Sequence, residues 1–342
     1  MKKALYWLSA ASLIAALIFA GCANKYTTSG KIAMNSKNWD KAINDFKMAI
    51  QANPADAAAH YNLAKCYKEK NESLLMVEHL EKASALDPNY KAEAEEFRSK
   101  AWITYFDSGN SNAKAEKYDQ ALTDFQTAIV LLPSRYEAYT NAGYVWTKLD
   151  NNDSAYSYYA QAYNISPTKK DLLMLYANLS FDMKYYDKAD SLYIKILESD
   201  TTDADAWFRR GLISNQKNEF DNAIKYYNKS LALAPDKCDP WFNLGLIYFQ
   251  HLKNDVEAEK AFSRANELCP NDVEAQIYYS SLLIANNKLD DAITLLKSIT
   301  VAHPNECVAW DLLSQALVRK GERKAAEEAM KKSEDCNASK QK

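Results

Sequence analysis

Seven of the eight prolines in this chain stand in one regular series, and that series limits the folds available to it. Five glycines lie 24 or 25 residues before positions of the series, and one position that lacks a proline carries Thr201. The prolines are Pro54, Pro88, Pro133, Pro167, Pro235, Pro270 and Pro304, separated by 34, 45, 34, 68, 35 and 34 residues. The glycines are Gly30, Gly109, Gly143, Gly211 and Gly245. Two residue types with one period predict a stacked array of units of about 34 residues.

Composition indicates that these units are helical. The chain has 342 residues, with only 7 glycines and 8 prolines, whereas average usage would give about 41 of the two together. Sheet-rich folds need these residues in their tight turns. We therefore expect helices joined by a few similar turns.

Each unit also carries a helical apolar stripe. Ala121, Phe125 and Ala128 stand at i, i+4 and i+7, on one face of a helix. A glycine in the preceding helix lets two backbones approach closely, and proline ends the second helix because it lacks the N–H group. No unit can bury its stripe alone, so stacking must supply the core.

The pattern resembles the tetratricopeptide repeat. One unit matches the consensus of that family at eight positions, namely Trp241, Leu244, Gly245, Tyr248, Ala258, Phe262, Ala265 and Pro270. The resemblance implies an all-α protein, a right-handed α-solenoid of about nine helix–turn–helix repeats. The repeats would cover residues 23–56, 57–90, 91–135, 136–169, 170–203, 204–237, 238–272, 273–306 and 307–338.

The third repeat, residues 91–135, breaks the register. Eleven extra residues within 91–101 are rich in helix formers and predict a helix lengthened by about three turns. Residues 108–112 are polar, have poor helix propensity and suggest a hinge between residues 22–90, with repeats 1–2, and residues 136–338, with repeats 4–9. A distorted but rigid repeat is the alternative. Residues 339–342 form a polar tail.

The N-terminus has the layout of an export signal. Lys2 and Lys3 precede an apolar stretch that ends at Ala20-Gly21-Cys22. Small residues before a cysteine resemble the bacterial lipobox, which implies removal of residues 1–21 and acylation of Cys22. An ordinary signal peptide with an incidental cysteine is the alternative. Ala23 follows the cysteine and no acidic cluster comes next, so we expect an outer-membrane lipid anchor with the body facing the periplasm.

Four cysteines occupy matched places in two repeats. Cys238 and Cys307 begin first helices, and Cys269 and Cys336 end the corresponding second helices. Because these ends meet in an antiparallel pair, each couple would form a disulfide, which an exported protein permits. Four unpaired thiols are the alternative. Cys66 fits a packing role.

We find no pattern of catalytic residues. The four histidines lack metal-ligand spacing, and motifs of phosphate-binding loops and nucleophilic hydrolases are missing from the sequence. We expect neither an enzyme nor a bound cofactor or metal. The net charge of −3, without a basic stripe, argues against nucleic acid.

The resemblance implies a concave groove lined by the first helices, at the positions that follow the Trp and Gly columns, a column being the equivalent position in every repeat. The candidate groove residues are Tyr61, Phe106, Tyr144, Met174, Asn178, Phe208, Arg209, Leu212, Phe242, Asn243, Leu246 and Ile277. Lys65, Asn110 and Thr140 share these columns. Exposed aromatic surface is typical of recognition sites; the alternative is that the aromatics pack between helices.

The sequence therefore predicts a lipid-anchored adaptor that binds envelope proteins or peptide segments and touches the membrane only through its anchor. The alternative is an outer-membrane lipoprotein that binds glycans or another ligand, since aromatic rings stack on sugars.

Overall fold

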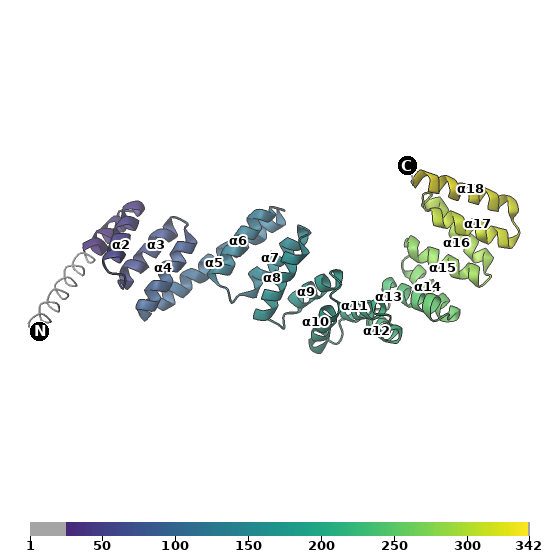
Figure 1. The fold of residues 1–342 in the computed structure, drawn as a ribbon, viewed down its shortest axis with the longest axis horizontal. Helices are drawn as coiled ribbons and strands as arrows, with labels where there is room; N and C mark the ends of the chain where they lie inside the picture. Colours follow the sequence, from purple (N-terminus) through teal and green to yellow (C-terminus); the bar gives the residue numbers. More distant parts are fainter. Residues whose placement is uncertain (1–24, 341–342) are drawn as a thin grey trace, which may run out of the picture. The chain divides into compact units, whose positions relative to one another are not determined.

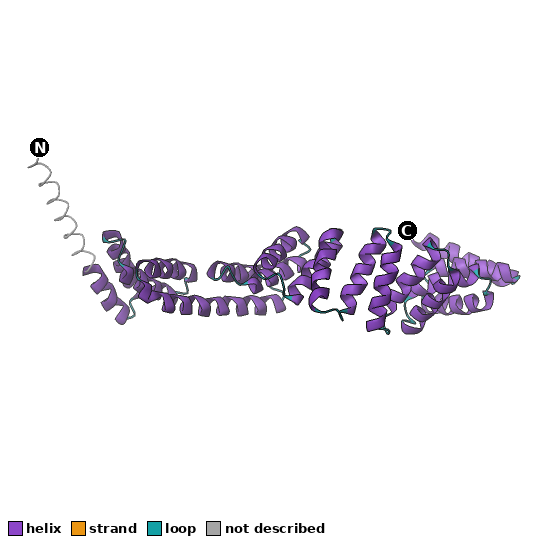
Figure 2. Ribbon diagram, turned by 90° about the horizontal axis from the view of Figure 1, so that it is seen from below, coloured by secondary structure: helices purple, strands orange, loops and turns teal. Residues whose placement is uncertain are grey.

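The computed structural model describes residues 25–340, and every regular element in that range is a helix (Figures 1 and 2). Residues 25–35 form the first one. The others are α2 (Trp39–Ala52), α3 (Ala57–Glu69), α4 (Ser73–Leu86), η1 (Pro88–Tyr90), α5 (Lys91–Lys114), α6 (Tyr118–Leu131), α7 (Tyr136–Lys148), α8 (Asn152–Ile165), α9 (Lys170–Asp182), α10 (Tyr186–Ser199), α11 (Ala204–Gln216), α12 (Phe220–Leu233), α13 (Cys238–Leu246), η2 (Ile247–His251), α14 (Asp255–Leu268), α15 (Val273–Ala285), α16 (Leu289–Ala302), α17 (Cys307–Lys320) and α18 (Arg323–Lys340).

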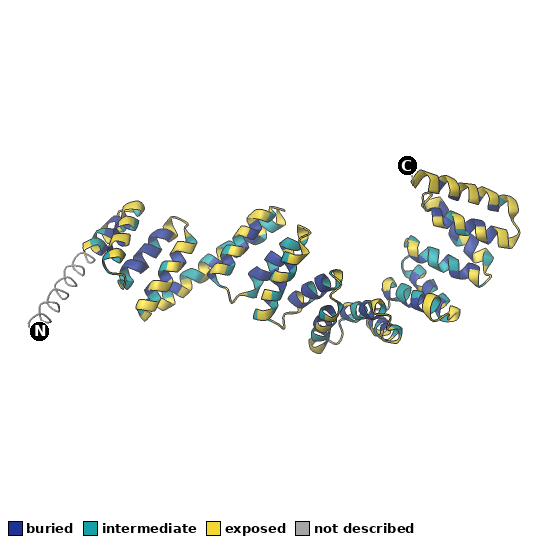
Figure 3. Ribbon diagram, viewed as in Figure 1, coloured by how far each residue is buried: buried dark blue, intermediate teal, exposed yellow. Residues whose placement is uncertain are grey.

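The helices pack in sequential pairs, as the repeat pattern predicts. Pairs such as α3 with α4, α7 with α8 and α17 with α18 make extensive contacts, and second helices also pack on the next first helix, as α6 does on α7 and α16 on α17. We call the first helix of a pair A and the second B. The buried side chains lie on the faces between helices (Figure 3). The chain divides into two compact units, Met1–Leu175 and Tyr176–Lys342.

The predicted signal peptide and Cys22 lie outside the described residues. Among helices within residues 25–340, none is long and apolar enough to cross a membrane.

One residue in left-handed conformation ends each A helix. These residues recur with the repeat period and are Lys37, Asn71, Glu116, Asp150, Lys184, Asn218, Lys253, Asn287 and Gly321. A positive φ angle is easy for glycine and tolerable for Asn and Asp. Only the last of these residues is a glycine, so the regularly spaced glycines of the sequence do not mark these turns.

The A and B helices of a pair cross where a small residue faces a ring. A Cβ atom added at Gly30, Gly109, Gly143, Gly211 or Gly245 would lie within 3 Å of the facing Phe or Tyr ring. Repeats with a larger residue in this column have a non-aromatic partner 16 residues later, as at Ala64 with Leu80 and Ser280 with Leu296. Ala177, which precedes Tyr193 by the same interval, is the exception.

The Trp column closes the turn between repeats. The indole N–H of Trp207 donates to the carbonyl oxygen of Thr201 over 3.0 Å, and that of Trp310 donates to Pro304 over 2.9 Å. The side-chain amide of Gln276 makes the same bond to Pro270 over 2.7 Å. This bond needs only a backbone carbonyl, which explains why Thr201 can replace a proline.

The 35-residue interval before Pro270 has a local cause. Thirteen residues separate Gly245 from Ala258, where twelve separate Gly211 from Ala223. The additional residue is absorbed by η2, a single π-helical turn that continues α13. A one-residue insertion in a helix commonly produces such a turn.

The predicted lengthening of the third repeat is present, but the helix has no break in it. α5 is continuous over 24 residues and includes residues 108–112. Ser108 Oγ and Asn112 Nδ2 donate to Asp124 Oδ2 on α6 over 2.7 and 2.8 Å, so these polar side chains are used in packing. The division into units falls inside α9, not beside α5.

The predicted tail also differs. α18 continues through Lys340, so residues 339 and 340 are helical.

Two histidines meet inside one hairpin. The Nδ1 atoms of His60 on α3 and His79 on α4 are 2.9 Å apart, and His60 Nε2 lies 3.3 Å from the carbonyl oxygen of Pro54. His60 therefore donates from Nε2 and accepts at Nδ1 from the Nδ1–H of His79, with both rings neutral. Burial lowers the pKa of His60; burial and then the neighbouring His60 lower the pKa of His79 to about 4.

We expect acid to destabilise this hairpin. Both histidines bind protons more readily when unfolded, so their contribution to stability is complete above pH 6.5 and is lost as the pH falls toward 4. Melting temperatures of the wild type and of the double variant His60→Gln, His79→Leu would test this between pH 7 and 4. Gln276 shows that glutamine preserves the bond to the turn. An unchanged pH dependence in the double variant would contradict the assignment.

The crossing contact gives a second prediction. A Cβ at Gly143 would lie 2.8 Å from Cδ1 of Tyr159, and overpacking of this kind costs about 1–3 kcal/mol. We expect Gly143→Ala to lower the free energy of unfolding, despite a gain of about 1 kcal/mol in helix propensity. In a Tyr159→Leu background, which resembles the pair Ala64 and Leu80, the same change should cost less. Urea unfolding of the four proteins measures the coupling, and additive effects would show that the contact does not govern the crossing.

Candidate recognition surface

Two A helices of the first unit border an open cavity of about 510 Å³. Its lining comes from α5, α6 and α7, namely Asn110, Ala113, Lys114, Phe125, Asn141 and Tyr144. Phe125 and Ala113 give it an apolar wall, Tyr144 is 44% exposed, and Lys114 supplies a positive charge. We call it the α5–α7 cavity.

An asparagine pair gives this cavity its polar chemistry. Asn141 Nδ2 donates to Asn110 Oδ1 over 2.7 Å, which joins α7 to α5. The bond leaves the Asn110 amide nitrogen as a donor and the Asn141 oxygen as an acceptor. One donor and one acceptor side by side match the C=O and N–H groups of a peptide backbone.

The other predicted groove residues of the first unit are less accessible. Tyr61 is 9% exposed and stacks on Tyr90 with ring centroids 4.5 Å apart, and burial raises the pKa of its hydroxyl. The Phe106 ring on α5 lies 6.0 Å from the Phe125 ring on α6, between ring centroids. Met174 is half-buried. Tyr61 and Phe106 thus pack between helices, as the alternative interpretation of these columns expects.

The predicted aromatics of the second unit are also half-buried. Phe208 lies 5.8 Å from the Tyr227 ring, and Phe242 lies 6.0 Å from Phe262, between ring centroids. Three aliphatic candidates are also partly buried and pack against buried hydrophobic residues of their own repeats, namely Leu212, Leu246 and Ile277. These side chains hold helices together and leave only part of their surface accessible, so shortening them would also cost stability.

The polar candidates of the second unit have partners within the chain. Asn178 Oδ1 accepts from the Tyr193 hydroxyl over 2.6 Å, and Asn243 Nδ2 donates to the Asp239 carbonyl over 2.8 Å. The Arg209 guanidinium lies 5.9 Å from the Phe181 ring centroid. The structure does not join these three into one site.

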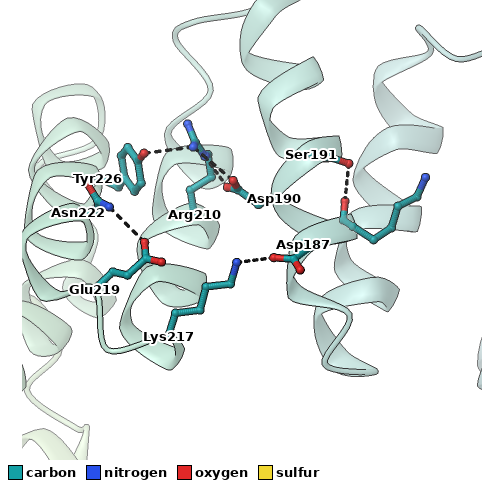
Figure 4. A network of polar contacts seen from close by, with 9 residues as sticks. Asp187, Asp190, Ser191, Arg210, Lys217, Glu219, Asn222 and Tyr226 are labelled. Carbon is teal, nitrogen blue, oxygen red and sulfur yellow. Dashed lines mark hydrogen bonds and ion pairs between the residues drawn. The ribbon is translucent and has the colours of Figure 1, made fainter.

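A separate network crosses α10, α11 and α12 (Figure 4). Arg210 Nε binds Asp190 Oδ1 at 2.6 Å, and its Nη2 donates to the Tyr226 hydroxyl over 3.1 Å. Lys217 Nζ pairs with Asp187 at 2.5 Å. The side chain of Arg210 is only 14% exposed, so this network joins three helices and is not a free charged surface.

The four matched cysteines are joined as the sequence predicts. Cys238 is bonded to Cys269 and Cys307 to Cys336, and each bond closes one A–B hairpin of the second unit. Cys66 is a buried thiol, and burial raises its pKa to about 11.

Sequence reasoning missed Asn141. Asn110 belongs to the groove column that comes after the Gly column. Asn141 comes directly after the other groove column, as Arg209 and Asn243 do in their repeats. The repeat register therefore places Asn141 at a groove position, but the sequence does not show that Asn141 pairs with Asn110 on another helix. Within residues 25–340, no three His, Cys, Asp or Glu side chains are grouped as a metal site would require.

Comparison with curated proteins finds short matches. The chain is 33% identical over 104 residues to cellulose synthase operon protein C of Escherichia coli K12, covering 29% of this chain and 9% of that protein. It is 24% identical over 124 residues to anaphase-promoting complex subunit 3 of Schizosaccharomyces pombe, covering 36% and 17%. The chain thus spans less than a fifth of these relatives.

A solved structure shows the same fold. A tetratricopeptide repeat protein from Parabacteroides merdae aligns with a TM-score of 0.53 at 17% identity, over 69% of this chain and 93% of that one. The MamA protein aligns with a TM-score of 0.48 at 20% identity, over 52% and 96%.

Family models match most of the chain. Models described as tetratricopeptide repeat match residues 57–90, 106–169, 204–237, 239–272 and 256–317, and one described as TPR repeat matches residues 30–71. Proteins with this fold are generally non-catalytic scaffolds for protein interaction. The chain belongs to the tetratricopeptide repeat family.

Proposed function

We propose that the chain is a lipid-anchored scaffold of a bacterial cell envelope and that it holds protein partners through its A helices. The observation that carries the proposal is the α5–α7 cavity, where an asparagine pair and an exposed tyrosine lie beside an apolar wall. An unfolded or extended segment of a partner protein is the ligand that this chemistry fits.

The recognition step uses the peptide backbone first. A backbone C=O group accepts from Asn110 and the neighbouring N–H donates to Asn141, while an apolar side chain packs on Ala113 and Tyr144. Lys114 favours an acidic group at the edge of the cavity. Backbone pairing gives affinity with little sequence selectivity, and the apolar contact adds selectivity.

The N-terminal sequence supports the anchor. Residues 1–21 have the layout of a lipoprotein signal, and acylation of Cys22 by two or three chains would hold the protein durably at a membrane. Two disulfides fit an oxidising compartment outside the cytosol. The residues after Cys22 favour the outer membrane, with the body facing the periplasm.

Two tryptophans are poorly placed to stack on sugars. The Arg135 guanidinium lies 4.0 Å from the Trp102 ring centroid, and Trp102 is buried. Lys229 Nζ lies 4.0 Å from the Trp207 centroid, and Tyr226 stacks on the same indole. Since their faces are covered by the protein's own side chains, we favour a protein partner over a glycan.

Changes in the cavity should reduce partner capture. We expect Asn141→Ala to lower the yield of the main partner about fivefold, since one hydrogen bond contributes about 1 kcal/mol. We expect Tyr144→Ala to lower the yield about tenfold or more, since the ring adds apolar contact. The measurement is in-cell cross-linking of the tagged chain, followed by quantitative mass spectrometry.

Tyr185→Ala is the matched control, because this tyrosine has a similar exposure of 47% but lies outside the cavity. Helicity and melting temperature should be unchanged in Tyr144→Ala. If both cavity variants retain the partners of the wild type, the cavity is not the recognition site.

The anchor is tested separately. We expect Cys22→Ala to abolish incorporation of labelled palmitate and to move the chain from the membrane fraction to the soluble fraction. Alkylation before and after reduction should reveal four additional thiols in the exported chain, one pair for each disulfide. Palmitate labelling that persists in the variant, or four thiols that react without reductant, would overturn this part of the proposal.

A further inference from the structure

The last repeat has an open groove along its A helix. A cavity of about 780 Å³ lies between α16 and α18, with Trp310, Leu313 and Leu317 of α17 as its floor. Ala325 and Ala329 line it from α18, and Val301 of α16, which is 83% exposed, stands at its edge. We call it the C-terminal groove.

The B helix places an alanine and no ring beside Trp310, and Ala261 takes the equivalent place beside Trp241. In three earlier repeats, the Trp-column side chain is covered by a ring from the B helix 19 residues later: His60 by His79, Tyr139 by Tyr158, and Trp207 by Tyr226. In the last repeat the same interval from Trp310 reaches Ala329. An alanine cannot cover an indole, so the Trp310 ring remains in the floor of the cavity.

The α18 wall of the groove carries a charge pattern that is complementary to itself. Ala325, Glu328, Ala329, Lys332 and Asp335 all line the groove, at the spacing of one helical face. When two such helices pack antiparallel about residue 330, Glu328 of one faces Lys332 of the other, and the reverse pair forms by symmetry. The two alanines let the helix backbones approach closely. Among residues 25–340, Glu328 and Lys332 have no ion-pair partner.

We infer that a second copy of this chain occupies the C-terminal groove, in a two-fold symmetric dimer. α18 of each copy lies in the groove of the other, over Trp310, Leu313 and Leu317. A two-fold axis needs a surface that matches itself, which is the property of this charge pattern. The α5–α7 cavity is in the other compact unit, so the inference does not depend on partner binding there.

The opposite wall of the groove adds to this match. Lys297 of α16 lines the groove across from α18. A helix that lies between the two walls brings its own Asp335 within reach of a lysine on α16, whereas an uncharged apolar ligand would leave these charges without partners. The mixed charges favour another copy of α18 over a uniformly acidic or basic segment.

Sedimentation equilibrium of the full chain in a density-matched detergent tests the dimer. The wild type should show a monomer–dimer equilibrium that weakens at high salt. Ala329→Tyr places over Trp310 the ring that Tyr226 places over Trp207, so it should fill the groove, keep the helicity and abolish the dimer. A wild type that remains monomeric at all concentrations overturns the inference.

Charge exchange tests the antiparallel pairing. Glu328→Lys and Lys332→Glu should each weaken association about tenfold or more, because two symmetry-related pairs become repulsive at once. The double variant should recover the dimer. Glu334→Lys, on the same helix but outside the groove, is the control and should associate as the wild type does. A dimer that ignores the single changes, including one held together by the detergent micelle alone, contradicts the proposed interface, as does a double variant that stays monomeric.

Discussion

The contact between a small residue of the A helix and a larger side chain of the B helix, most often a ring, is the constraint on which the rest of this structure depends. Where the A helix has glycine, the B helix presents Phe or Tyr to its backbone, as at Gly211 and Tyr227. The contact fixes how close the two helices lie, and that distance decides which side chains can reach the next repeat. Ala64 with Leu80 and Ser280 with Leu296 preserve the fit with other sizes. The matched quantity is the combined volume of the pair.

Features that repeat could be predicted from the sequence, because each has a period that one chain displays many times. The A and B helices are of this kind, and against their period the eleven extra residues of α5 and the matched cysteine pairs also stand out. Features that join two particular side chains could not be predicted from the sequence. The asparagine pair Asn110–Asn141 and the histidine pair His60–His79 occur once each, and neither residue type specifies its partner. Residues 108–112 suggested a hinge because of their poor helix propensity. In the structure, that propensity is offset by the hydrogen bonds of Ser108 and Asn112 to one particular side chain, Asp124.

The groove columns show how packing and recognition compete for the same side chains. Phe208 and Phe242 face the surface that such repeats offer to partners, yet each packs on a ring of its own hairpin. A half-buried aromatic stabilises the repeat and gives a partner only its edge. Tyr144 differs, because it is exposed and borders the cavity whose wall contains Phe125. We therefore place recognition where a cavity lies beside unsatisfied amide groups, and not wherever an aromatic column passes.

Departures from the repeat are the informative positions in an array of this kind. The additional residue in η2 is absorbed locally, and the bond from the Trp column to the turn survives replacement of tryptophan by Gln276. These departures preserve packing. At Ala329 the repeat has an alanine where another repeat has Tyr226 over Trp207, and the half-buried Trp310 lies in the floor of the C-terminal groove. A repeat that lacks its own covering ring leaves apolar surface that a side chain from outside the repeat can cover.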